Sequence, residues 1–98
     1  MEVILGDAKL DRLEVDPTFD GGFSPAVVRA FRMRMQLIRA AVDERAFHAL
    51  KSLHFEKLSG NREGQHSMRL NSQWRLIVGF EGSAKKKLVC IIGIEDYH

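Results

Sequence analysis

The sequence predicts one α+β domain over residues 1–98, with N-terminal helices packed on one face of a curved antiparallel β-sheet. Two observations support this fold class. Apolar residues recur at helical spacing in the first half of the chain, whereas apolar and polar residues alternate in the second half. The strands expected in the second half are joined by short connections, which force neighbouring strands to run antiparallel.

Helices are predicted in the first half, after a short strand at Val3–Leu5. Asp7 can cap a helix that runs through Val15. Ser24 and Pro25 suit the cap and the first position of a second helix, because serine accepts a hydrogen bond from a free amide and proline needs no partner there. Apolar residues recur along this helix for about twenty residues: Val27, Phe31, Met35, Ile38 and Val42.

The opposite side of the second predicted helix carries a polar row. At about 100° per residue, this row consists of Arg29, Arg32, Gln36 and Arg39. It is either a solvated helix face or a contact surface for an acidic partner, and the sequence leaves both interpretations open.

Strands are predicted in the second half, after a stretch at Arg45–Leu53 that is either a short helix or an ordered connection. A turn-rich run, Ser59–Gly64, follows that stretch. The runs with strand character are His66–Leu70, Gln73–Val78 and Leu88–Ile94. Asn71-Ser72 and residues 82–84 supply the turns between them.

Composition excludes several classes of protein. The formal net charge is only +2, so any nucleic-acid site must come from local clustering of cations. Cys90 is the single cysteine, which rules out an intrachain disulfide. No apolar run approaches the roughly 20 residues of a membrane span and no signal-peptide pattern opens the chain, so we expect a cytoplasmic protein. The four histidines show no metal-ligand spacing and no phosphate loop occurs, so we expect neither metal nor cofactor.

Basic side chains gather on or next to the predicted strands. Arg69 and Arg75 alternate with apolar neighbours, and Lys57 precedes the turn-rich run. If the helices cover the apolar face of the sheet, these three cations project from the open face. Cations that converge on one surface can hold phosphates, through planar guanidinium forks and lysine point charges.

The polar residues Glu95–His98 directly follow the apolar run 88–94. Such an end can simply fray. A central strand would instead deliver these groups to a fixed place, where an acid, a phenol and an imidazole can orient and transfer protons.

Two motifs in this order resemble those of HigB-type toxins in the RelE/ParE superfamily. The first joins a lysine–leucine–x–glycine turn to a serine–x–arginine strand and an asparagine–x–x–tryptophan–arginine strand, here Lys57–Gly60, Ser67–Arg69 and Asn71–Arg75. The second is the ending Asp96-Tyr97-His98. With the helical first half, the resemblance spans nearly the whole chain. Many relatives carry histidine where this chain has Glu56, so the resemblance does not decide whether His54, His66 or Glu56 assists catalysis.

The resemblance implies a RelE-like fold and a metal-independent endoribonuclease that cleaves mRNA in the ribosomal A site by attack of the 2′-hydroxyl. The catalytic residues would then be Asp96, Tyr97, His98, Arg69 and Arg75, and the RNA-binding residues Lys57, Arg62, Arg69 and Arg75. It also implies a HigA-like helix-turn-helix antitoxin, through which alone the toxin would reach operator DNA.

Two other functions remain open on this fold. A ParE-like toxin would poison DNA gyrase through protein contacts and would not need a proton-transferring end, so Asp96-Tyr97-His98 favours the nuclease. A non-catalytic RNA-binding module would need aromatic side chains exposed on the sheet. Trp74 alternates onto the apolar side, which disfavours that module.

Overall fold

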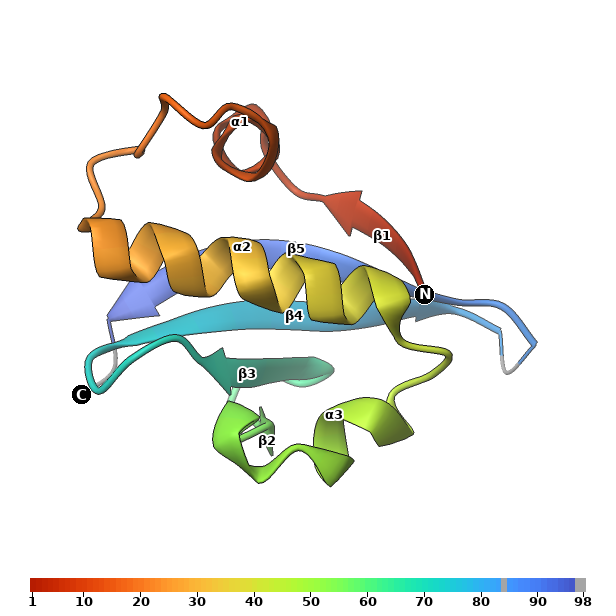
Figure 1. Ribbon diagram of the computed structural model, residues 1–98. Helices are drawn as coiled ribbons and strands as arrows, with labels where there is room; N and C mark the ends of the chain where they lie inside the picture. The colour runs from red at the N-terminus through yellow and green to blue at the C-terminus, as the bar shows by residue number, and fades with distance from the viewer. Residues whose placement is uncertain (84, 97–98) are drawn as a thin grey trace.

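The structure, a computed structural model, describes residues 1–83 and 85–96, and in these residues the fold is α+β (Figure 1). The strands form one sheet in the order β1-β5-β4-β3-β2. Along the chain the elements are β1 (Glu2–Leu5), α1 (Ala8–Val15), α2 (Pro25–Ala40), α3 (Arg45–Ala49), the 3-10 helix η1 (Lys51–Leu53), β2 (Glu56–Lys57), β3 (Gln65–Arg69), β4 (Trp74–Gly82) and β5 (Lys87–Asp96). The predicted fold class is confirmed.

Both predicted helix starts are confirmed by their caps. The Asp7 carboxylate accepts a hydrogen bond from the backbone N–H of Leu10 at 2.7 Å and opens α1. The Ser24 hydroxyl accepts one from the backbone N–H of Val27 at 3.3 Å, and Pro25 occupies the first turn of α2. Each cap satisfies an amide that has no partner inside its own helix.

The end of α2 differs from the prediction. The helix stops at Ala40, because Ala41 takes an extended conformation with ψ 140° and turns the chain toward α3. Val42 therefore lies beyond the helix and is 92% exposed, so its assignment to the apolar row was wrong. The stretch predicted as a short helix or ordered connection is helical in two pieces, α3 and η1.

The sheet is antiparallel from β2 to β5, as the short connections predicted. β1 is the exception, because it pairs in parallel with β5. The connection between these two strands runs from residue 6 to residue 86, so the rule for short connections does not apply to it. β5 is thereby enclosed between β1 and β4 and is a central strand.

One face of the sheet is covered by α1 and α2 (Figure 1). Phe31, Met35 and Ile38 of α2 are fully buried in a core that also contains Met68 of β3 and Leu76 of β4. Trp74 packs toward this core, with its ring 5.6 Å from that of Phe23. The prediction that Trp74 faces the apolar side is confirmed.

A β-bulge in β5 determines which side chains reach the other face. Ile77 of β4 pairs with Gly93 and Val78 pairs with Ile91, so Ile92 is an extra residue in β5. An extra residue shifts all later side chains to the opposite face of the sheet. The bulge therefore brings Glu95 to the face opposite the helices, where strict alternation from Val89 and Ile91 would have turned it toward the core.

Candidate functional site

The face of the sheet opposite the helices carries a row of polar side chains from adjacent strands. In the strand register Arg69 of β3 pairs with Arg75 of β4, which in turn pairs with Glu95 of β5. Ser67 pairs with Ile77 of β4 on one side and with Glu56 of β2 on the other. Paired residues project to the same side, so these groups share one surface, called the open face below.

A hollow of about 220 Å³ lies in the open face. It is lined by Leu58, Arg62, Ser67, Arg75, Ile77, Glu95 and Asp96. The sequence predicted Arg62, Arg75 and Asp96 as site residues, and the structure places these three around one hollow. Arg69 adjoins it as the register partner of Arg75.

Arg75 is largely buried in this site, with its side chain only 12% exposed. Its Nη1 donates to the Ser67 hydroxyl at 3.2 Å and to the backbone carbonyl of His54 at 3.4 Å, and it lies 3.9 Å from the Glu56 carboxylate. Ser67 is itself 1% exposed, so its hydroxyl would lack this partner without Arg75. These contacts fix the guanidinium in one orientation, which preorganises it to bind an anion.

Arg69 is held by the turn that follows its own strand. Its Nε donates to the backbone carbonyl of Asn71 at 3.2 Å, and its Nη1 lies 3.5 Å from Nε2 of His54. The backbone carbonyl of Arg69 accepts a hydrogen bond from Nε of Arg34 at 3.1 Å. Burial lowers the pKa of the Arg34 guanidinium, yet an arginine stays charged at any physiological pH.

His54 links these two arginines, whereas His66 does not take part. His54 has a left-handed backbone with φ 46°, which a residue other than glycine rarely adopts. In this conformation the His54 carbonyl accepts a hydrogen bond from Arg75, and the His54 imidazole lies beside Arg69. Of the residues whose role the sequence left open, His54 and Glu56 lie at the arginines.

His66 lies on the helix-covered face. Its ring stacks on Phe55 with centroids 4.8 Å apart and meets Phe80 edge-on at 5.4 Å. Lys57 is the register partner of His66 and projects to the same side. The expectation that Lys57 shares a face with Arg69 and Arg75 is therefore not met, because β2 pairs with β3 in the register that turns Glu56 to the open face instead.

Arg62 makes an ion pair across the hollow. Its Nη1 and Nη2 each lie 2.6 Å from a carboxylate oxygen of Glu95, and its Nε donates to the Gln65 side chain at 3.0 Å. These hydrogen bonds raise the pKa of Arg62 and lower the pKa of Glu95. Arg62, predicted as an RNA-binding residue, thus has its guanidinium fork bound within the protein.

The C-terminal motif is described only as far as Asp96. Its carboxylate accepts a hydrogen bond from the Gln73 side chain at 3.1 Å, and Asp96 is paired with Trp74 across the strands. Tyr97 and His98, both predicted as catalytic, lie outside the described residues. Asp96 lies at the rim of the hollow that Arg75 lines.

Two arginines of the polar row of α2 bind α1 and the loop after it. Arg32 donates to the backbone carbonyls of Leu13, Asp16 and Phe19 at 3.0, 2.9 and 3.2 Å. Arg39 forms a two-pronged ion pair with Glu14 at 2.7 and 2.8 Å. Both arginines hold the first segment of the chain against α2.

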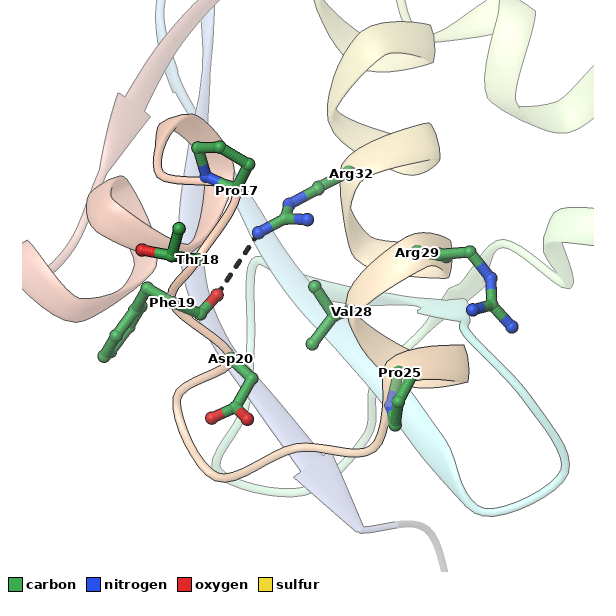
Figure 2. A pocket seen from close by; sticks show the side chains of 8 residues that line it. All are labelled: Pro17, Thr18, Phe19, Asp20, Pro25, Val28, Arg29 and Arg32. Carbon is green, nitrogen blue, oxygen red and sulfur yellow. Dashed lines mark hydrogen bonds between the residues drawn. The ribbon is translucent and has the colours of Figure 1, made fainter.

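A hollow of about 340 Å³ lies beside Arg32, between the loop and the start of α2 (Figure 2). Arg32 is directed at the loop, whereas Arg29 is directed away from it (Figure 2). Arg29, Gln36 and Arg39 are exposed, as in a solvated face, whereas Arg32 is partly buried.

Within residues 1–83 and 85–96, no three His, Cys, Asp or Glu side chains are close enough together to hold a metal ion. In that same part of the chain, no helix has the length and apolar character needed to cross a membrane.

The sequence did not single out Ser67 or Glu95 as site residues. Ser67 could have been found from alternation, since it shares a face with Arg69. Glu95 could not, because its orientation depends on the bulge at Ile92, and nothing in the apolar run Leu88–Ile94 marks that position.

Comparison with known proteins gives a family and a fold. The family described as "RelE-like toxin of type II toxin-antitoxin system HigB" matches residues 6–91. Among solved structures, the YoeB/ParE toxin from Agrobacterium tumefaciens has a similar fold, with a TM-score of 0.66, 18% sequence identity and 100% of both chains covered. No curated protein matches the chain significantly. The family match ends before Glu95 and the terminal motif.

Proposed function

Because the chain belongs to the HigB-like family of RelE-type toxins of type II toxin–antitoxin systems, we propose that it is a ribosome-dependent endoribonuclease that cleaves mRNA and inhibits translation. One observation carries the proposal. Arg75 is held in a fixed orientation in a hollow whose rim ends at Asp96, so a phosphate at Arg75 lies next to the start of the motif Asp96-Tyr97-His98.

The chemistry needs no metal, because RNA carries its own nucleophile. The 2′-oxygen attacks the adjacent phosphorus, the bond from phosphorus to the 5′-oxygen breaks, and a 2′,3′-cyclic phosphate forms. A base takes the 2′-proton and an acid protonates the departing 5′-oxygen. Arg75 and Arg69 stabilise the charge that develops on the phosphate oxygens.

His98 and Tyr97 supply the proton transfer in this proposal. An unperturbed imidazole has a pKa of about 6.5, so it can accept or donate a proton near neutral pH. Asp96 orients His98 or a neighbouring arginine. His54 and Glu56, which lie at Arg69 and Arg75, are the described groups placed to assist.

We further propose that a HigA-like helix-turn-helix antitoxin neutralises the toxin and carries it to operator DNA. The ribosome and its mRNA are then the targets in the cytoplasm. Arg32 and Arg39 of α2 are bound within the chain, so the polar row offers an acidic segment of the antitoxin less charge than the sequence suggested, and Arg29 is its exposed arginine without such a bond among the described residues.

The test is induction of the gene without its partner, with 5′ ends of cellular mRNA mapped by primer extension. Growth arrest with new mRNA ends inside translated codons supports the proposal. Growth arrest with intact transcripts and broken chromosomal DNA contradicts it and supports gyrase poisoning instead.

A further inference from the structure

The ion pair between Arg62 and Glu95 spans the sheet above the hollow. Arg62 belongs to the turn between β2 and β3, whereas Glu95 lies near the end of β5, two strands away from β3. Both terminal nitrogens of the guanidinium reach the carboxylate at 2.6 Å, and Nε is bound to Gln65. Three of the five guanidinium N–H groups, one on each nitrogen, are thus bound within the protein, and the charge is neutralised by Glu95, which weakens the attraction of Arg62 for an RNA phosphate.

Glu95 is also the direct register partner of Arg75. Opposed residues in antiparallel strands have Cβ atoms about 4.5–5.5 Å apart, on the same side of the sheet. A Glu95 side chain released from Arg62 can therefore reach the Arg75 guanidinium, which already lies 3.9 Å from Glu56. An arginine–carboxylate pair is among the stronger interactions available there.

We propose that Arg62 is a charge shield: by holding the Glu95 carboxylate, it keeps Glu95 from competing with an RNA phosphate for Arg75. This inference rests on the proposed function. It makes Arg62 a positioning residue, which acts through Glu95 and not by touching RNA.

The charges around the hollow explain why such a shield matters. The cations there are Arg62, Arg69 and Arg75, and the carboxylates on the same face are Glu56 and Glu95. Removing the charge of Arg62 leaves the Glu95 carboxylate without its ion pair beside the position of the phosphate. A negative charge at that place repels the phosphate and also attracts the Arg75 guanidinium away from it.

The test compares Arg62→Gln with the double variant Arg62→Gln/Glu95→Gln, in single-turnover cleavage of a short mRNA bound in the ribosomal A site. Arg62→Gln should lose on the order of a hundredfold in cleavage rate, because an unpaired carboxylate faces the phosphate. The double variant should recover most of that loss, because it no longer carries the carboxylate.

A double variant as slow as Arg62→Gln would overturn the inference and leave the proposed function intact, since it would show that Arg62 contacts RNA or maintains the fold. Arg39→Gln is the matched control. It breaks another two-pronged arginine–glutamate pair, with Glu14, away from the hollow. Its cleavage rate should equal that of the parent.

A second measurement does not depend on cleavage. The Nε–H resonance of Arg75, followed by NMR, should shift in Arg62→Gln as Glu95 pairs with Arg75, and should return in the double variant. An unchanged resonance in Arg62→Gln would overturn the inference. If the parent cuts no RNA, the proposed function fails, and this resonance still decides whether Arg62 separates Glu95 from Arg75.

Discussion

The two faces of the sheet carry different chemistry, although their residues alternate along the same strands. In β3, His66 and Met68 point into the aromatic and apolar layer under the helices, whereas Ser67 and Arg69 point to the open face. Arginines occur on both sides. Arg32 and Arg39 of α2 bind carbonyls and Glu14 within the chain, whereas Arg75 lies beside Arg69 and Glu95 on the open face.

Residue type alone therefore does not identify a functional arginine. Arg32 and Arg75 both make several hydrogen bonds and both border a hollow, yet Arg32 binds backbone carbonyls that join α1 and its loop to α2, whereas Arg75 lies beside charged side chains of the adjacent strands. Substitutions on the open face should therefore affect activity more than stability. Substitutions on the covered face should do the reverse.

The largest effect is expected at the end of the chain. Deleting His98 removes the proposed acid or base. The cleavage rate should fall by about 10²–10⁴, and the thermal midpoint should stay near that of the parent. His98→Gln keeps a hydrogen-bonding group without the titration and should be similarly slow. Parental cleavage rates in both variants would contradict the assignment.

The second-largest loss of cleavage is expected at Arg75 and Arg69, and the structure adds an expected difference in stability between their variants. Replacement of either by alanine should lower the cleavage rate by about 10²–10³, the effect of losing one fixed donor to a developing charge. Their stabilities should differ, because Arg75 supports the buried Ser67 hydroxyl and Arg69 does not.

Arg69→Ala should keep the thermal midpoint within a few degrees of the parent, as a surface change does. Arg75→Ala should lower the free energy of unfolding by about 1–3 kcal/mol, because it leaves a buried hydroxyl unpaired. Chemical denaturation measures both values. A fully active Arg75→Ala protein would show that the hollow is not the reaction site.

Arg32→Ala tests the expectation for the helix-covered face of the sheet. The variant loses hydrogen bonds to three backbone carbonyls, so it should lower the free energy of unfolding by about 1–3 kcal/mol. The cleavage rate per folded molecule should not change. A lowered rate in a variant that remains folded would show that α2 takes part in the site.

The smallest expected effect is the contribution of His66 to the pH dependence of stability. Burial lowers the pKa of its imidazole, and its buried Nδ1 has no hydrogen-bond partner among the described residues. The unfolded chain then binds a proton more readily, so stability is complete above about pH 6.5. It falls as the pH drops toward the lowered pKa of the folded state.

His66→Phe should remove this pH dependence and leave the cleavage rate unchanged. Thermal unfolding of parent and variant between pH 5 and pH 8 measures the difference, which should amount to a few degrees. Equal pH dependence in both proteins would place the titrating group elsewhere.

The helices and strands that depend on local signals could be predicted from the sequence. Asp7, Ser24 and Pro25 mark helix starts because their side chains act on amides a few residues away. The end of α2 could not be predicted, because Val42 continues the apolar period after the backbone has already turned. The parallel pairing of β1 with β5 depends on residues far apart in the chain.

In the site, too, only the features set by local sequence could be predicted. Alternation placed Arg69 and Arg75 on the open face, because it is a property of each strand. The face of Lys57 depends on the register between β2 and β3, and the partner of Arg62 lies 33 residues away in the sequence. Register and long-range ion pairs are set by tertiary packing, which one sequence does not display.

The central claim, RNA cleavage by 2′-hydroxyl attack at the open face, is tested most directly by the chemistry of the product ends. A short mRNA bound in the ribosomal A site is treated with the purified toxin, and the fragments are analysed by mass spectrometry. Attack by the 2′-hydroxyl should leave a 2′,3′-cyclic phosphate on one fragment and a 5′-hydroxyl on the other, and both products should be lost in Arg75→Ala. A 5′-phosphate on the downstream fragment, or unbroken mRNA, would contradict it.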